Sequence, residues 1–169
     1  MEGNPFTQFV FQIFIFCAIL IIGYTCNFYY LAFLSSRRKE NDSVIEVGEP
    51  TITIQLPIYN EKYVATRLVD AVCQQDYPKD KMRIMVLDDS DDDTVETMSN
   101  TVKKYQSLGF DIEHVRRGTR SGYKAGALKH AMKSTDSEFV AIFDADFIPP
   151  NWYLKKAMPH FAKSNIGLV

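Results

Sequence analysis

The chain has 169 residues, a length that suffices for one domain with a modest core. Its formal net charge is −2. A near-neutral charge gives no indication of nucleic-acid binding. The three cysteines show no C-x-x-C spacing. Without that spacing, we expect no zinc site. Because the number of cysteines is odd, they provide no disulfide framework, so we expect a reducing, cytosolic setting for the globular part.

The N-terminal region is apolar over a long stretch. Residues 9–34 contain no charged side chain, and a membrane-spanning helix needs about 20 such residues. We therefore expect a transmembrane helix over residues 9–34. A cleaved signal peptide fits less well, because the apolar run is too long and no basic segment precedes it. Arg37, Arg38 and Lys39 follow directly. The positive-inside rule then predicts an extracytoplasmic N-terminus over residues 1–8 and a cytosolic linker over residues 35–49.

From residue 50 onward, patterns typical of strands and helices alternate. Short runs rich in β-branched and apolar residues predict strands at 51–56, 83–87, 110–115 and 139–143. Apolar residues at helical spacing predict helices at 61–75, 94–105, 123–133 and 152–161. This alternation predicts an α/β domain with a parallel sheet.

Helix ends are indicated by single residues. Asn60 and Glu61 are expected to start the first helix after the linker, Thr94 and Asn151 to cap later ones, and Gly109 to end the second. Pro159 is expected to kink or split the last helix.

The run over residues 139–143 organises this pattern, because it leads directly into Asp144 and Asp146. Its apolar residues predict a strand that is buried on both faces. The two carboxylates are expected on the same side of an extended backbone, at the sheet edge where α/β proteins bind ligands. Such a pair can hold Mg²⁺ or Mn²⁺, and the common alternative is a solvated acidic turn.

Two further segments join this acidic pair. Asp88 and Asp89 follow the strand at 83–87, where they either bind a base or ribose or merely cap a turn. Lys124 lies between Gly122 and Gly126 at the start of a helix, and a helix N-terminus attracts phosphate. A cation on Asp146 and the ammonium group of Lys124 would hold a diphosphate between them. Taken alone, Lys124 would be interpreted as a surface lysine.

Four motifs in order now resemble family 2 glycosyltransferases, most closely their cellulose-synthase-like branch. The motifs are Gln-Leu-Pro-Ile-Tyr-Asn-Glu at 55–61, Val-Leu-Asp-Asp-Ser-Asp-Asp at 86–92, Gly-Tyr-Lys-Ala-Gly-Ala-Leu at 122–128 and Phe-Asp-Ala-Asp-Phe at 143–147. The resemblance covers residues 51–169. Each motif is weak alone, but four in order are a strong signal.

The resemblance implies a GT-A fold and inverting transfer of a sugar from a nucleotide donor, with a divalent cation. Asp89, together with Asp88, would contact the base, and Lys124 would lie near the base and diphosphate. Asp144 and Asp146 would form the Asp-x-Asp pair, with Asp146 as the principal metal ligand. The remaining residues expected to line the nucleotide pocket are Pro57, Tyr59 and Glu61. Many relatives carry Asn where this chain has Ala127.

Other parts of the family pattern are absent from these 169 residues. The catalytic base of a Thr-Glu-Asp-like motif and a Gln-x-x-Arg-Trp motif are not found, and the base is expected beyond Val169. We therefore expect the membrane anchor and the donor-binding half, residues 50–169, of a longer polysaccharide-forming enzyme, inactive in transfer alone. UDP-glucose and GDP-mannose are both candidate donors, and the acceptor would be a glycan or lipid. The last four residues, Ile166 to Val169, are expected to begin another strand.

Two alternatives remain open. A haloacid-dehalogenase-like phosphatase would use Asp144 as its nucleophile, but its motif normally opens the fold. The second alternative is a membrane-anchored nucleotide-binding module without catalytic activity, since no catalytic base is identified.

Overall fold

The structure is a computed structural model that describes residues 4–37, 48–162 and 166–169. It consists of two compact units, a long helix near the N-terminus and an α/β unit. We describe each unit by itself. The predicted linker over residues 35–49 lies largely outside the described residues.

Helix α1 spans Pro5–Arg37 and has no buried side chain. Asn4 caps it, because its side-chain oxygen accepts the backbone N–H of Phe6 at 3.0 Å, and Pro5 suits the first helical position. These two residues explain why the helix starts before residue 9. The helix is long and apolar enough to cross a membrane, since 33 residues extend over roughly 50 Å.

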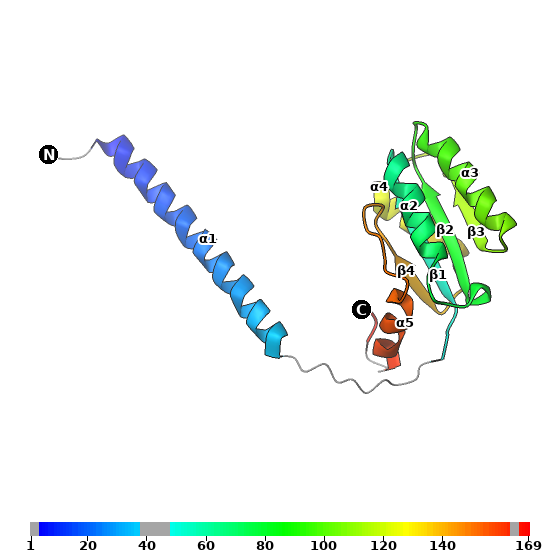
Figure 1. Ribbon diagram of the computed structural model, residues 1–169. Helices are drawn as coiled ribbons and strands as arrows, with labels where there is room; N and C mark the ends of the chain where they lie inside the picture. The colour runs from blue at the N-terminus through cyan, green and yellow to red at the C-terminus, as the bar shows by residue number, and fades with distance from the viewer. Residues whose placement is uncertain (1–3, 38–47, 163–165) are drawn as a thin grey trace. The chain divides into compact units, whose positions relative to one another are not determined.

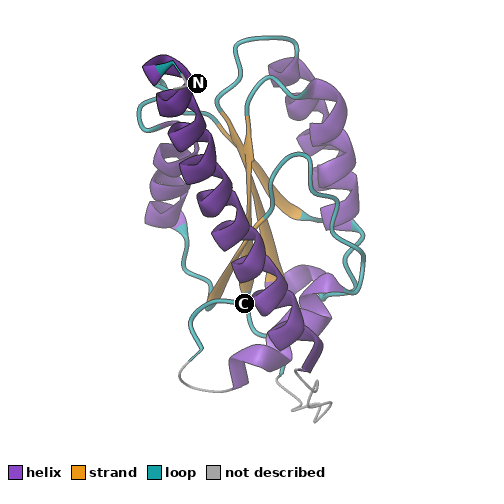
Figure 2. Ribbon diagram, turned by 90° about the vertical axis from the view of Figure 1, so that its left-hand side faces the viewer, coloured by secondary structure: helices purple, strands orange, loops and turns teal. Residues whose placement is uncertain are grey.

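The α/β unit is built on a four-stranded sheet of order β3-β2-β1-β4. All three strand pairs are parallel, as the alternating pattern predicts. The strands are β1 (Ile52–Ile58), β2 (Met82–Asp88), β3 (Asp111–Val115) and β4 (Phe139–Ile142). Figure 2 shows these strands twisting relative to one another, as expected for L-residues.

Helices cover both faces of this sheet. The helices are α2 (Lys62–Cys73), α3 (Thr94–Ser107), α4 (Tyr123–Ala131) and α5 (Tyr153–Ala157), with short 3₁₀ turns at Lys79–Lys81, Met132–Ser134 and Met158–Ala162. Helices α2 and α3 lie side by side over one face (Figure 1). Helix α4 packs on the opposite face, as the core residues show.

Alternation along β2 separates the two cores. Ile84 and Val86 contribute to the larger cluster, which includes buried residues of α2, α3 and α5. Met85 and Leu87 point the other way and pack with α4. Successive strand residues point to opposite faces, so one run of apolar residues serves both layers. The end of β2 is thereby fixed by packing from both sides.

Several helix starts differ from the predictions by one residue or two. Of the two residues predicted to start α2, Glu61 precedes the helix, whereas Asn60 lies one residue earlier with a left-handed φ of 54°. Thr94 is the first residue of α3 rather than its cap, and its N–H donates to Asp92 Oδ1 at 2.9 Å. Gly109 ends α3 as predicted, with φ of 82° and the paired hydrogen bonds of a Schellman motif.

The C-terminal predictions also need correction. Trp152, not Asn151, precedes α5, since the Asn151 carbonyl accepts the N–H of Asp76 at 2.8 Å. Pro159 lies in the 3₁₀ turn that follows α5, so it does separate the predicted helix into two parts. The segment from Ile166 to Val169 forms no strand. Val169 is 58% exposed, so the apolar side chains of this segment are not held in a sheet as the pattern predicted.

The prediction that the strand over residues 139–143 is buried on both faces is wrong. Within the described residues, β4 pairs only with β1 and forms an edge of the sheet. None of its four residues is buried, and Ile142 is 49% exposed. The apolar run ends one residue earlier as a strand, before Phe143.

Candidate functional site

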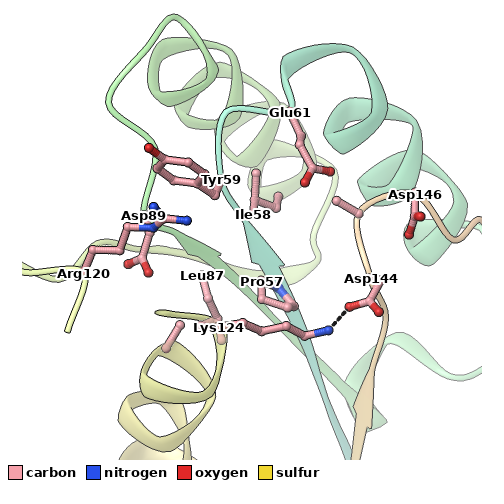
Figure 3. Close-up of a pocket in the computed structure, with 12 residues that line it drawn as sticks. Pro57, Ile58, Tyr59, Glu61, Leu87, Asp89, Arg120, Lys124, Asp144 and Asp146 are labelled. Carbon is pink, nitrogen blue, oxygen red and sulfur yellow. Dashed lines mark hydrogen bonds and ion pairs between the residues drawn. The ribbon is translucent and has the colours of Figure 1, made fainter. Parts of the chain in front are cut away.

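A cavity of about 460 Å³ opens at the carboxyl ends of β1 and β2, next to the loop after β4 and the start of α4. This position is where open α/β sheets bind ligands. Figure 3 shows its side chains converging from these four elements. The lining residues are Pro57, Ile58, Tyr59, Glu61, Leu87, Asp89, Arg120, Lys124, Ala127, Asp144, Ala145 and Asp146. All side chains predicted for the site except Asp88 are among them.

The turn after β1 brings Tyr59 to the cavity. Asn60 holds this turn against the turn after β2, because its backbone N–H donates to Ser90 Oγ at 2.9 Å and its amide exchanges two hydrogen bonds with Asp91. The guanidinium of Arg120 lies 3.2 Å from the centre of the Tyr59 ring, a cation–π contact. Tyr59 and Arg120 therefore form one wall (Figure 3).

Asp88 points away from the cavity into the protein. It is the last residue of β2 and 1% exposed, and His114 Nε2 lies 2.8 Å from its Oδ2. The backbone N–H of Ser90 donates to Oδ1 at 2.9 Å. Burial alone would raise the pKa of Asp88, but these bonds from His114 and Ser90 outweigh burial and hold the pKa below its ordinary value. This carboxylate is therefore ionised, and both of its oxygens bind partners inside the fold.

Asp89 faces the cavity and is held by Arg117. Arg117 Nε donates to Oδ1 at 2.7 Å and Nη2 to Oδ2 at 2.5 Å. The two side chains are only 12% and 7% exposed, so the pair is shielded from solvent. Tyr59, Asp89 and Arg120 line this part of the cavity, and Arg117 holds Asp89 from behind it. We call these four residues the arginine end.

The N-terminus of α4 carries Lys124 and depends on two glycines. Gly122 has φ of 73°, a conformation that favours glycine. At Gly126 a Cβ would lie 2.1 Å from the Ser121 carbonyl oxygen and 2.6 Å from Arg117 Nη1. The loop can cross the first turn of α4 only because this side chain is missing. This close packing of the loop on α4 fixes the backbone position from which the Lys124 side chain extends.

Lys124 extends beneath Pro57 across the cavity and forms an ion pair with Asp144 (Figure 3). Both partners are about half exposed, at 49% and 57%. Asp144 and Asp146 do not lie on an extended backbone as predicted, because the N–H of Phe147 donates to the Asp144 carbonyl at 3.0 Å and closes a turn. The turn still places both carboxylates at the cavity.

Glu61 joins these two aspartates from the other side of the cavity. Burial raises its pKa, and the negative charges of Asp146 and Asp144 raise it further. We call Glu61, Asp144 and Asp146 the carboxylate end. Figure 3 places it opposite the arginine end, with Lys124 between them.

The carboxylate end fits a hard divalent cation only in part. Carboxylate oxygens are the ligands that Mg²⁺ and Mn²⁺ prefer. Among the described residues, however, no three His, Cys, Asp or Glu side chains are close enough to hold an ion by themselves. Asp144 and Asp146 would therefore share an ion with oxygens of a bound ligand, the usual arrangement for Mg²⁺ at phosphates.

Sequence reasoning did not identify the two arginines of the arginine end. Both belong to the segment over residues 116–121, which holds three arginines and which we call the basic loop. The sequence alone does not show which of these arginines faces the cavity. Ile58, Leu87 and Ala145 also line it, and each is an immediate neighbour of a predicted residue.

Fold and cavity together define a class: a parallel α/β domain of the GT-A type, with a polar cavity at the carboxyl ends of its strands. The model of glycosyl transferase family 2 matches residues 53–169. The chain belongs to glycosyl transferase family 2, and the predicted family and fold class are confirmed.

Related proteins agree with this assignment. The chain is 43% identical over 122 residues to the probable glucomannan 4-beta-mannosyltransferase 10 of Arabidopsis thaliana, a match that covers 68% of this chain and 22% of that protein. This likeness supports the predicted cellulose-synthase-like branch. The chain thus spans about a fifth of this relative's length.

Solved structures show the same fold. The mannosyltransferase PcManGT from Pyrobaculum calidifontis, in complex with GDP-Man and Mn²⁺, is similar with a TM-score of 0.73 and 27% identity, over 86% of this chain and 42% of that one. TarS residues 1–349 from S. aureus, in complex with UDP-GlcNAc, are similar with a TM-score of 0.58 and 26% identity, over 66% of this chain and 31% of that one.

Proposed function

We propose that the protein binds the nucleotide-sugar donor of an inverting glycosyltransferase that is anchored in a membrane. One observation carries this proposal. A single cavity joins a shielded carboxylate, Asp89, to a lysine and an acidic turn, Lys124 and Asp144-Ala145-Asp146. These are the groups that a base, a diphosphate and its counter-ion require, in that order along the cavity.

The predicted roles follow from this order. Asp89 accepts hydrogen bonds from the base, and Pro57 and Tyr59 line the nucleotide pocket. Lys124 carries the positive charge toward the diphosphate, as a point charge at the start of α4. Asp146, with Asp144, holds Mg²⁺ or Mn²⁺, which when bound neutralises the charge that develops on the leaving diphosphate. Asp88 supports Asp89 from inside the fold instead of contacting the donor.

The ion pair between Lys124 and Asp144 has a consequence for binding. Both groups have to exchange their mutual contact for contacts with the ligand, Lys124 with phosphate and Asp144 with the cation. Because both side chains are half exposed, this ion pair contributes only about 0–1 kcal/mol. The exchange is therefore cheap, and it allows nucleotide and cation to enter together.

We propose GDP-mannose as the donor, with UDP-glucose as the alternative. The Arabidopsis relative is described as a mannosyltransferase, and the Pyrobaculum enzyme was solved with GDP-Man. Arg120 adds a physical argument, because its guanidinium lines the cavity and matches the two acceptors of a guanine edge. The acceptor would be a glycan or lipid, and polysaccharide synthesis is the process that we infer.

Helix α1 is proposed as the membrane anchor. Its length and composition support a membrane span, and Arg37 at its C-terminal end agrees with the predicted cytosolic position of the α/β unit. The catalytic base is not assigned to any residue of this chain, and its place beyond Val169 stays a prediction. We therefore expect donor binding without sugar transfer by these 169 residues.

Calorimetric titration of the detergent-solubilised chain tests the proposal. GDP, UDP and ADP are added with and without Mn²⁺, to the wild type, to Asp146→Ala and to Asp80→Ala as an exposed control outside the cavity. We expect Mn²⁺-dependent GDP binding that is lost in Asp146→Ala and kept in Asp80→Ala. Absence of nucleotide binding by the folded wild type would contradict the proposal.

The phosphatase alternative has its own test. Asp144 as a nucleophile would become covalently phosphorylated, whereas its ion pair with Lys124 and the family match favour a binding role. Phosphoryl transfer to Asp144 from a small phosphate donor, detected by mass spectrometry, would revive the alternative. Donor binding without transfer even in a longer protein would favour the non-catalytic binding module.

A further inference from the structure

The guanidinium of Arg117 forms more hydrogen bonds within the protein than those of the neighbouring arginines of the basic loop do. Besides its two bonds to Asp89, Nη1 donates to the Ser121 carbonyl at 2.8 Å and Nη2 to the Tyr123 carbonyl at 2.8 Å. The side chain is 12% exposed. Four bonds from one shielded guanidinium thus connect the end of β2 to the loop and to the first residue of α4.

The surrounding backbone is shaped to admit this guanidinium. Gly126 has no Cβ, and one placed there would lie 2.6 Å from Arg117 Nη1. Tyr123 adopts φ of 48°, which is uncommon for a residue with a side chain, and its carbonyl is one of the acceptors. A strained residue persists only where neighbouring contacts hold it, and Arg117 supplies one of them.

We propose that Arg117 is a positioning residue, which fixes the Asp89 carboxylate toward the cavity and ties it to the first turn of α4, which carries Lys124. Each carboxylate oxygen has two acceptor sites, so Asp89 bound by Arg117 can still accept a hydrogen bond from a ligand. The bidentate geometry leaves the carboxylate a single orientation. The consequence for nucleotide binding rests on the function proposed above, whereas the tie between β2 and α4 does not.

Arg116 provides a matched control on the adjacent position. Its Nη2 donates to the Ser90 carbonyl at 2.7 Å, so it supports the same turn. Among the described residues it forms no hydrogen bond with Asp89 or α4. A lysine at position 117 would keep the charge but not the planar fork. Arg117→Lys therefore separates the effect of charge from that of geometry.

The first measurement compares ligands that do and do not contain a base. Calorimetry with Mn²⁺ gives the Kd of GDP, UDP and inorganic pyrophosphate for the wild type, Arg117→Met, Arg117→Lys, Asp89→Asn, the double variant Arg117→Met/Asp89→Asn, and Arg116→Met. We expect Arg117→Met to weaken the preferred nucleotide at least tenfold and pyrophosphate less than threefold. The double variant should bind no more weakly than the worse single variant, and Arg117→Lys should recover less than half of the loss.

An equal loss for nucleotide and pyrophosphate would overturn the positioning role, as would fully additive effects of Arg117→Met and Asp89→Asn. Either result would mean that Arg117 acts on the fold as a whole. The same loss in Arg116→Met would overturn it too, because that variant leaves Asp89 untouched.

A second measurement needs no ligand. Hydrogen exchange of the amides in residues 121–126 should quicken several-fold in Arg117→Met and in Asp89→Asn, but not in Arg116→Met. Unchanged exchange in Arg117→Met would disprove the tie to α4. If the wild type binds no nucleotide, the proposed function fails, and this exchange result still decides whether Arg117 ties β2 to α4.

Discussion

The two ends of the cavity are built in different ways. At the arginine end, Asp89 and Arg117 are 7% and 12% exposed and bonded at every polar group of the pair. At the carboxylate end, Asp144 and Asp146 are exposed and follow an edge strand. For the proposed donor site, we infer that the arginine end would recognise one part of the ligand through preformed geometry. The carboxylate end would be completed only when the ligand brings its own oxygens and cation.

The largest expected effect concerns the support of the arginine end. His114→Leu leaves the Asp88 carboxylate buried without its side-chain hydrogen-bond partner, which costs about 3 kcal/mol and lowers Tm by roughly 10 °C. His130→Leu is the control, because His130 is exposed. Thermal denaturation of both variants at neutral pH measures the difference. Equal Tm values for the two variants would show that the Asp88–His114 pair does not stabilise the fold.

The pH dependence of that effect has a definite sign. In the wild type the pKa of Asp88 lies below its ordinary value, so its stabilising contribution is present above about pH 4 and is lost as pH falls through the folded pKa. Without His114, fewer bonds oppose the effect of burial, so the pKa of Asp88 is higher than in the wild type, and protonation relieves the penalty at a higher pH. We therefore expect the difference between His114→Leu and wild type to shrink on acidification, and a difference that grows would contradict this.

The next largest effect is expected at Gly126. Helix propensity alone would favour alanine there by about 1 kcal/mol, but its Cβ would meet the Ser121 carbonyl at 2.1 Å. Gly126→Ala should therefore destabilise the fold by about 2 kcal/mol and weaken nucleotide binding. Gly118→Ala, in the loop that precedes α4, meets nothing within 4 Å and serves as control. Denaturant unfolding measures both, and a stabilised Gly126→Ala would show that the loop can move.

Lys124 should separate binding from stability. Lys124→Met removes a half-exposed ion pair, so unfolding free energy should change by less than about 1 kcal/mol. Nucleotide diphosphate binding should weaken about tenfold, the value of one charge-assisted bond. Lys129→Met, an exposed lysine of the same helix, should change neither. Calorimetry and denaturant unfolding test this, and a large loss of stability would mean that Lys124 supports the fold instead.

The smallest effect is expected at Glu61. Its raised pKa means that its charge opposes folding above the ordinary pKa of a glutamate, and this cost vanishes at lower pH. Glu61→Gln should therefore stabilise the protein at pH 7 by less than about 0.5 kcal/mol and leave stability unchanged near pH 3. Mn²⁺-dependent binding measured at pH 7 should weaken. Stronger binding would mean that Glu61 only repels the neighbouring aspartates.

Much of this arrangement could be predicted because it is local in sequence. The strand β2 ends where its apolar run meets an acidic pair, the run of β4 leads into another, and the ends of parallel strands meet at one sheet edge. Asp89, Lys124 and Asp146 could be placed at the cavity for that reason. Four motifs in order then identified the family.

The remainder depends on which residues meet across the fold. Neighbouring strand residues point to opposite sides, but Asp88 and Asp89 are alike, so sequence does not say which one faces the cavity. His114 decides this by pairing with Asp88. Arg116, Arg117 and Arg120 are equally indistinguishable until the crossover to α4 is known. The edge position of β4 was missed because five apolar residues look the same in a central and an edge strand.

The order of the strands also bears on how the site assembles. The turns after β1 and β2 are joined by the Asn60–Ser90 bond, across 30 residues, whereas the start of β4 is joined to β1 by the Glu138–Thr51 bond, across 87 residues. Closing the longer loop costs about 1 kcal/mol more in chain entropy. Strands β1, β2 and β3 can therefore pair before β4 arrives. During folding the arginine end would form first, and the acidic turn would be added last, as the step that completes the cavity.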